Sequence, residues 1–142
     1  MKTSVLALAM IVVVPLALAP AQDGKDDQKQ IQGTWKLVEA KENGNANDKL
    51  QGLILIFRDG KVTVKKGDEV KLEGRYKLDP SKSPKWIDLI TDKVTFLGIY
   101  QIKGDTLTIC HGDAKAQERS TKFVSEASGP NQNLAILKRE KK

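Results

Sequence analysis

The sequence predicts an all-β domain in which eight antiparallel strands form a closed up-and-down barrel. Apolar and polar residues alternate over 69–78, as they do in a strand that buries one face. Hairpin signals, Asp59-Gly60 and Gly104-Asp105, join neighbouring runs of this kind. No stretch beyond the first 21 residues has a helical period, so strands are expected to build the core.

The first 21 residues have the organisation of an export signal. A short basic start precedes an apolar run over 5–18, and the small residues Ala19 and Ala21 suit a signal peptidase. We expect cleavage after Ala21, because Pro20 would hinder cleavage after Ala19. An uncleaved anchor is the alternative, although the run is shorter than the roughly 20 residues of a membrane span. The mature protein is therefore expected in the periplasm or outside the cell, without a stable membrane span.

Beyond this signal peptide, residues 1–21, we expect a flexible leader over 22–30 and one barrel domain over 31–142. The leader is polar and has no periodicity. The domain is long enough to bury a core without disulfide bonds. Cys110 is the only cysteine of the chain, so its thiol is buried, free to oxidise, or bonded to another chain. Burial is the favoured interpretation.

The expected strands follow one another at short intervals. In the first, Trp35 and Leu37 share a face, and the turn-rich stretch 43–45 ends it. Residues 47–52 have room for one helical turn before the second strand, and two prolines make the loop 79–85 rigid. We expect the strands at 33–40, 53–57, 61–65, 69–78, 86–91, 97–102, 106–110 and 133–139.

Eight strands with one apolar face each need either two stacked sheets or one sheet closed on itself. Closure removes the exposed edges of a sheet, and a succession of hairpins favours an up-and-down barrel. A two-layer sandwich is the alternative.

The segment 33–37, Gly-Thr-Trp-Lys-Leu, resembles the opening strand of the calycins, the superfamily of lipocalins and fatty-acid-binding proteins. The chain is more closely similar to an uncharacterised lipocalin-like domain family, found chiefly in exported proteins of planctomycete bacteria. The similarity spans about 31–140. It rests on the segments 31–38, 74–80, 84–89, 98–100, 104–110 and 137–140. The resemblance implies a lipocalin-like barrel, but the family has no established activity.

The resemblance also implies a plug at one end of the barrel. In lipocalins, an arginine from near the end of the last strand covers the tryptophan of the first strand. Arg139 and Trp35 match these positions, and Gly33 opens the same motif. A guanidinium stacked on an aromatic ring contributes roughly 0.5–2 kcal/mol. We therefore expect this pair to join the first strand to the last.

The residues favour no catalytic, cofactor or metal site. Cys110 and His111 are adjacent in a strand, so their side chains point to opposite faces and the histidine cannot activate the thiol. One histidine and one cysteine fall short of a zinc site. The alternative is acid–base chemistry by two carboxylates among Asp88, Asp92 and Asp105. We expect a protein that is not an enzyme and has no cofactor.

The net charge of +6 does not indicate a nucleic-acid partner. Acidic residues interrupt the basic ones along 69–78, and the aromatic residue of this run points to the other face. The charges are those of a solvated strand surface.

Two functions stay open. The barrel is expected to be a binding module for a small apolar ligand, with Phe57, Tyr76 and Tyr100 lining its cavity. In the alternative, these side chains fill the core, and loops such as 79–85 or 113–120 bind another exported protein, as an inhibitor or an envelope component.

Overall fold

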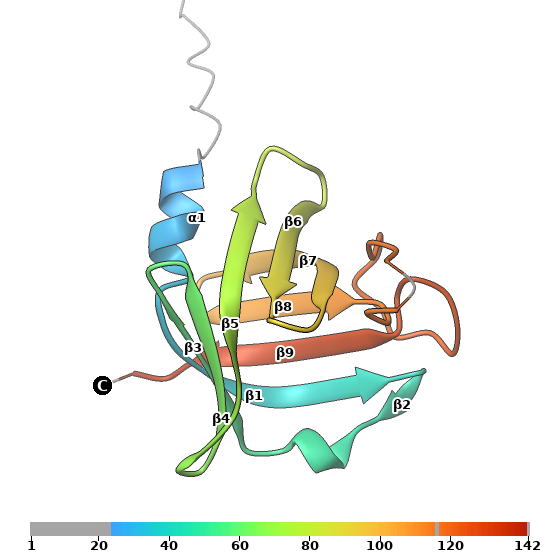
Figure 1. Cartoon of the computed structure of the whole chain (residues 1–142), viewed down its shortest axis with the longest axis horizontal. Helices are drawn as coiled ribbons and strands as arrows, with labels where there is room; N and C mark the ends of the chain where they lie inside the picture. The colour runs from blue at the N-terminus through green and yellow to red at the C-terminus, as the bar shows by residue number, and fades with distance from the viewer. Residues whose placement is uncertain (1–23, 116, 142) are drawn as a thin grey trace, which may run out of the picture.

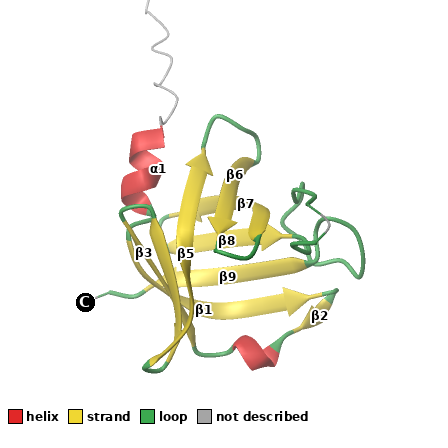
Figure 2. Ribbon diagram, viewed as in Figure 1, coloured by secondary structure: helices red, strands yellow, loops and turns green. Residues whose placement is uncertain are grey.

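The computed structural model describes residues 24–115 and 117–141 (Figure 1). The predicted signal peptide, 1–21, lies outside them. The described part contains the helix α1 (Gly24–Gln30), the 3₁₀ helix η1 (Asp48–Leu50) and nine strands (Figure 2). The strands are β1 (Gly33–Glu42), β2 (Asn45–Ala46), β3 (Leu53–Arg58), β4 (Lys61–Lys66), β5 (Glu69–Asp79), β6 (Lys85–Ile90), β7 (Thr95–Lys103), β8 (Thr106–His111) and β9 (Asn133–Arg139). Neither described helix is long and apolar enough to cross a membrane.

Eight of these strands form one closed antiparallel barrel, which confirms the predicted fold class (Figure 1). Neighbours follow the chain from β1 and β3 through to β9, and β9 pairs back with β1. This last pairing closes the sheet and excludes the two-layer alternative. The bounds of the eight predicted strands differ from the observed ones by at most two residues. The ninth strand, β2, is a two-residue addition that pairs only with the end of β1.

The barrel has two different ends. The end where β1 begins carries α1, the β3–β4 and β7–β8 hairpins and the end of β9, and we call it the closed end. The end where β1 finishes carries η1, the β4–β5 and β6–β7 hairpins and the segment between β8 and β9, and we call it the open end. Because successive strands run in opposite directions, the loops that connect them lie alternately at the two ends. A ligand at the closed end would therefore contact different loops from a ligand at the open end.

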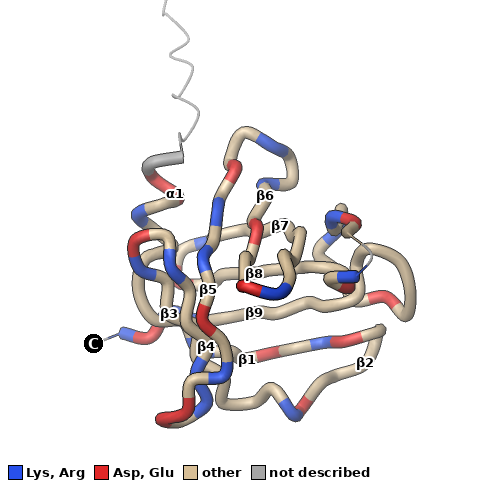
Figure 3. Tube along the Cα trace, viewed as in Figure 1, with Lys and Arg blue, Asp and Glu red and all other residues tan. Residues whose placement is uncertain are grey.

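A bulge in the β4–β5 ladder changes the side to which one residue points. The register shifts between Val64 and Lys65. Val70 then lies on the outer surface with Ile56 and Thr63 and is 47% exposed, whereas the alternation over 69–78 predicts it inside with Leu72. Beyond the bulge, β5 follows the predicted pattern, and its outer face carries both basic and acidic residues (Figure 3).

The expectation of a flexible leader over 22–30 is wrong for residues 24–30, which form α1. The Asp27 side chain of this helix is only 3% exposed, and the Ile31 amide donates to the Asp27 carbonyl. A helix of 7 residues is too short to be stable in isolation, so contacts with the barrel must hold it. The sequence pattern carries no sign of those contacts.

Candidate functional site

Trp35 lies at the centre of the closed end. Its side chain is fully buried, and its indole Nε1 donates to the Ile31 carbonyl at 2.8 Å. The guanidinium carbon of Arg139 lies 4.2 Å from the centre of the indole ring. The structure thus brings together the two residues that the resemblance assigns to a plug.

Arg139 also fastens the chain that leads from α1 into β1. Its Nη1 donates to the Gln32 carbonyl at 3.0 Å and its Nη2 to the Gln30 carbonyl at 2.5 Å. Gly33 has a φ of +121°, in a region that favours glycine, and the guanidinium lies 3.6 Å from where a Cβ would stand. The role of Gly33 is therefore to turn the backbone beneath the arginine.

A buried carboxylate connects α1 to the barrel wall. Oδ2 of Asp27 accepts from the Tyr100 hydroxyl at 2.5 Å and from the Lys85 ammonium at 2.8 Å. Burial raises the pKa of Tyr100, and the hydrogen bond to Asp27 and the charge of that carboxylate raise it further. Tyr100 therefore serves as a permanent donor to Asp27 at neutral pH. Sequence reasoning missed Asp27 because it treated the leader as unstructured.

Tyr76 makes the second contact between α1 and the barrel. Its hydroxyl oxygen accepts from the side-chain amides of Gln28 at 2.8 Å and Gln32 at 2.7 Å. Its ring packs edge-on against Phe57, with 5.0 Å between the ring centres, and burial raises the pKa of its hydroxyl. All three aromatic residues expected to line a cavity, Phe57, Tyr76 and Tyr100, are thus buried at the closed end.

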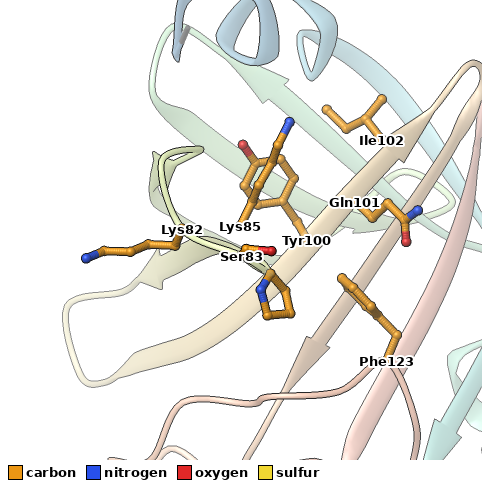
Figure 4. Close-up of a pocket in the computed structure, with 8 residues that line it drawn as sticks. Lys82, Ser83, Lys85, Tyr100, Gln101, Ile102 and Phe123 are labelled. Carbon is orange, nitrogen blue, oxygen red and sulfur yellow. The ribbon is translucent and has the colours of Figure 1, made fainter. Parts of the chain in front are cut away.

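A groove of about 410 Å³ opens on the outer side of the closed end (Figure 4). Its walls are residues of the loop before β6, of β7 and of the segment after β8, namely Lys82, Ser83, Pro84, Lys85, Tyr100, Gln101, Ile102 and Phe123. Lys82 extends away from the groove, and its ammonium lies 4.7 Å from the centre of the Trp86 ring. Lys85 and Tyr100 are both engaged by Asp27. The Lys85 ammonium and the Tyr100 hydroxyl of its wall therefore have a partner within the protein.

The barrel interior is less covered at the open end. Trp35 and Leu137 at the closed end are fully buried, whereas Leu72 at the open end is 37% exposed. The other inward apolar side chains of the open end are half-buried, namely Ala40, Leu53, Leu89, Phe96 and Ala135. The interior thus changes from a packed core to an accessible apolar lining along the barrel axis.

His111 belongs to this accessible lining. A Cβ on Gly98, its partner across β7 and β8, would lie 3.3 Å from the His111 Cβ and 3.4 Å from the core residue Ile87. The His111 side chain therefore points inward, where its ring centre lies 5.0 Å from that of Phe96. Its Nδ1 lies 2.9 Å from the Gly112 carbonyl, and burial lowers its pKa. The ring is accordingly neutral at pH 7, with the proton on Nδ1.

Cys110 lies on the other side of the barrel wall from His111. Its partner across β7 and β8 is Ile99, and both are buried beneath the segment that joins β8 to β9. The thiol donates to the Val124 carbonyl at 3.3 Å, and burial raises its pKa. The two residues therefore cannot act as a catalytic pair, and the thiol is held in its unreactive form.

Arg119 fastens the same segment to the outer wall, a role that the sequence does not indicate. It donates to the Gly98 carbonyl at 2.8 Å and to the Asp88 carboxylate at 2.7 Å, and it stacks on Trp86 at 4.2 Å. Asp92 and Asp105, the other two carboxylates considered for acid–base chemistry, lie in hairpins at opposite ends of the barrel. The structure does not bring the three together.

Among the described residues, no group of three histidine, cysteine, aspartate or glutamate side chains is placed to hold a metal ion. Comparison of the chain with models of known families, with curated proteins and with solved structures gives no significant match. The function must therefore be argued from the side chains of the barrel itself.

Proposed function

We propose that the protein is a non-catalytic binding module that holds a small apolar ligand in the open end of its barrel. The observation that carries this proposal is the change in burial along the axis. Side chains are packed around Trp35 at the closed end, but inward apolar side chains such as Leu53 and Leu89 are only half-buried at the open end. Covering them would remove apolar surface from water, which is the main source of affinity for such a ligand.

The outer groove at the closed end is the competing location. Its volume of about 410 Å³ is adequate for a small molecule. However, the ammonium of Lys85 and the hydroxyl of Tyr100 are engaged by Asp27, so neither group is free to fix the orientation of a ligand there. The open end combines an apolar lining with the neutral ring of His111, and this favours it as the site.

We also propose that the protein works outside the cytoplasm, after removal of residues 1–21. The apolar run over 5–18 and the small residues before Gln22 support export. The proposal that it is not an enzyme is supported by the separation of Cys110 from His111 across the barrel wall.

The test is binding of a neutral apolar fluorophore, N-phenyl-1-naphthylamine, to two matched variants. Leu89→Trp places an indole in the open end, and Ile102→Trp places the same side chain in the wall of the outer groove. We expect the folded wild type to bind the fluorophore and Leu89→Trp to lose most of this binding, while Ile102→Trp keeps it. Thermal melting of both variants controls for folding. Loss of binding in Ile102→Trp alone, or no binding by the wild type, would refute the proposal.

A further inference from the structure

Three polar residues of the open end, on β1, β9 and β8, form one continuous row. Glu42 of β1 lies directly opposite Asn133 of β9, and Asn133 lies directly opposite His111 of β8. Directly opposed residues of antiparallel strands project to the same face of a sheet. Because His111 points inward, the three side chains share the inner face of the barrel at its open end.

An apolar layer lies immediately below this row. Two residues further in along the same three strands are Ala40, Ala135 and Ile109, which belong to the core or pack against it. Two residues in a strand span roughly 6–7 Å. A molecule that enters the open end therefore meets hydrogen-bonding groups at the rim and apolar side chains beneath them, on one wall of the barrel.

The hydrogen-bonding chemistry of this row is specific. The Gly112 carbonyl can only accept, so the Nδ1 of His111 at 2.9 Å donates to it, and Nε2 carries the lone pair. No described residue donates to Nε2. Glu42 presents a carboxylate, of which Oε2 accepts from the Asn47 side chain at 2.8 Å. Two of the three groups in the row are therefore acceptors, and only the amide of Asn133 can also donate.

The charge of the row, like its acceptors, disfavours a negatively charged head group. Glu42 brings a negative charge to this wall. Lys66, one of the cations at the open end, lies on β4, at the far side of the ring of strands from β8, and its ammonium donates to the Lys49 carbonyl at 3.2 Å. A carboxylate head group beside His111 would face Glu42 without a donor from His111 Nε2.

We infer that the open end selects an apolar ligand whose head group donates a hydrogen bond and carries no negative charge, as a primary alcohol or an amine does. This inference rests on the proposed function, because it names the ligand class of the same site. The alkyl part lies against the half-buried apolar lining, and the head group donates to Nε2 of His111. Glu42 discriminates against carboxylates.

The experiment compares ligands of equal chain length that differ only in the head group. Decan-1-ol, its methyl ether 1-methoxydecane, decylamine and decanoate are titrated into the wild type and into His111→Phe at pH 7.5. We choose phenylalanine because it keeps a ring against Phe96 and removes the acceptor. One hydrogen bond contributes roughly 0.5–1.5 kcal/mol. We therefore expect the wild type to prefer the alcohol to the ether by about 2- to 12-fold, and His111→Phe to lose this preference.

A second variant keeps the inference testable if His111→Phe does not fold. Glu42 is exposed, so Glu42→Gln leaves the core unchanged. It is expected to strengthen decanoate binding and weaken decylamine binding, with decan-1-ol least affected. An equal affinity of the wild type for alcohol and ether, a preference that His111→Phe retains, or decanoate as the tightest ligand would overturn the inference. If none of the four ligands binds to the folded protein, the proposed function fails as well, and the two failures are thereby distinguished.

Discussion

Removing the indole of Trp35 is the most direct test of the closed end. The side chain is fully buried, contributes its ring face to the Arg139 guanidinium at 4.2 Å and donates to the Ile31 carbonyl at 2.8 Å. Trp35→Ala removes this packing, leaves a cavity and deprives a backbone carbonyl of its donor. Substitutions of this kind cost about 3–5 kcal/mol, and we expect a loss of unfolding free energy in that range. The part that depends on Arg139 is about 0.5–2 kcal/mol.

Urea unfolding followed by circular dichroism measures the total loss, and Trp86 provides a fluorescence signal that all variants retain. A double-mutant cycle with Arg139→Met isolates the stacking contribution, because methionine keeps part of the apolar stem and removes the guanidinium. Arg139→Met also removes the hydrogen bonds to the Gln30 and Gln32 carbonyls. This loss contributes equally to the free energy of the substitution in the wild type and in Trp35→Ala, so it cancels from the coupling energy.

The two outcomes that would contradict this reasoning differ. A loss below about 1 kcal/mol for Trp35→Ala would show that the indole is not a structural plug, since mutations without a specific mechanism cost no more than that. A large loss with no coupling to Arg139→Met would keep Trp35 in the core but deny that the arginine stabilises it.

Three further predictions concern other parts of the barrel. Burial raises the pKa values of Tyr76 and Tyr100, the only two tyrosines. Absorbance at 295 nm should therefore show less tyrosinate at pH 10 in the folded protein than in the unfolded chain, and stability should fall as the pH rises above that value. Burial lowers the pKa of His111, the only histidine, so as the pH falls the unfolded chain protonates this residue before the folded protein does. The contribution of His111 to stability should therefore be complete above pH 6.5 and be lost as the pH falls below that value. Chemical denaturation of His111→Phe should show a smaller decline over the same range. A Cβ on Gly98 would lie 2.7 Å from the Cys110 carbonyl oxygen, so Gly98→Ala should lower the unfolding free energy by about 1–3 kcal/mol, whereas an unchanged melting temperature would show that the two strands separate easily.

The candidate site was less predictable than the strands. Sequence reasoning selected Phe57, Tyr76 and Tyr100 because they lie on the inward apolar faces of their strands, and the structure places all three in the packed closed end. It considered His111 as a partner for Cys110 or a zinc ligand, rejected both roles, and favoured a strand-end residue that meets solvent. Whether a residue lies near the plug or near an opening depends on its distance from each end of the barrel, and alternation along one strand carries no such information.

The sequence by itself determined the eight strands, the turns between them and the inward direction of Trp35, because alternation and turn chemistry act within a few residues of chain. Only the tertiary structure decided the rest. The helix α1 forms because Asp27 finds Lys85 and Tyr100 across 58 and 73 residues of chain. The row of Glu42, Asn133 and His111 exists because closure between β9 and β1 brings three strands into one register. Such contacts depend on how distant strands align, and no local pattern encodes that alignment.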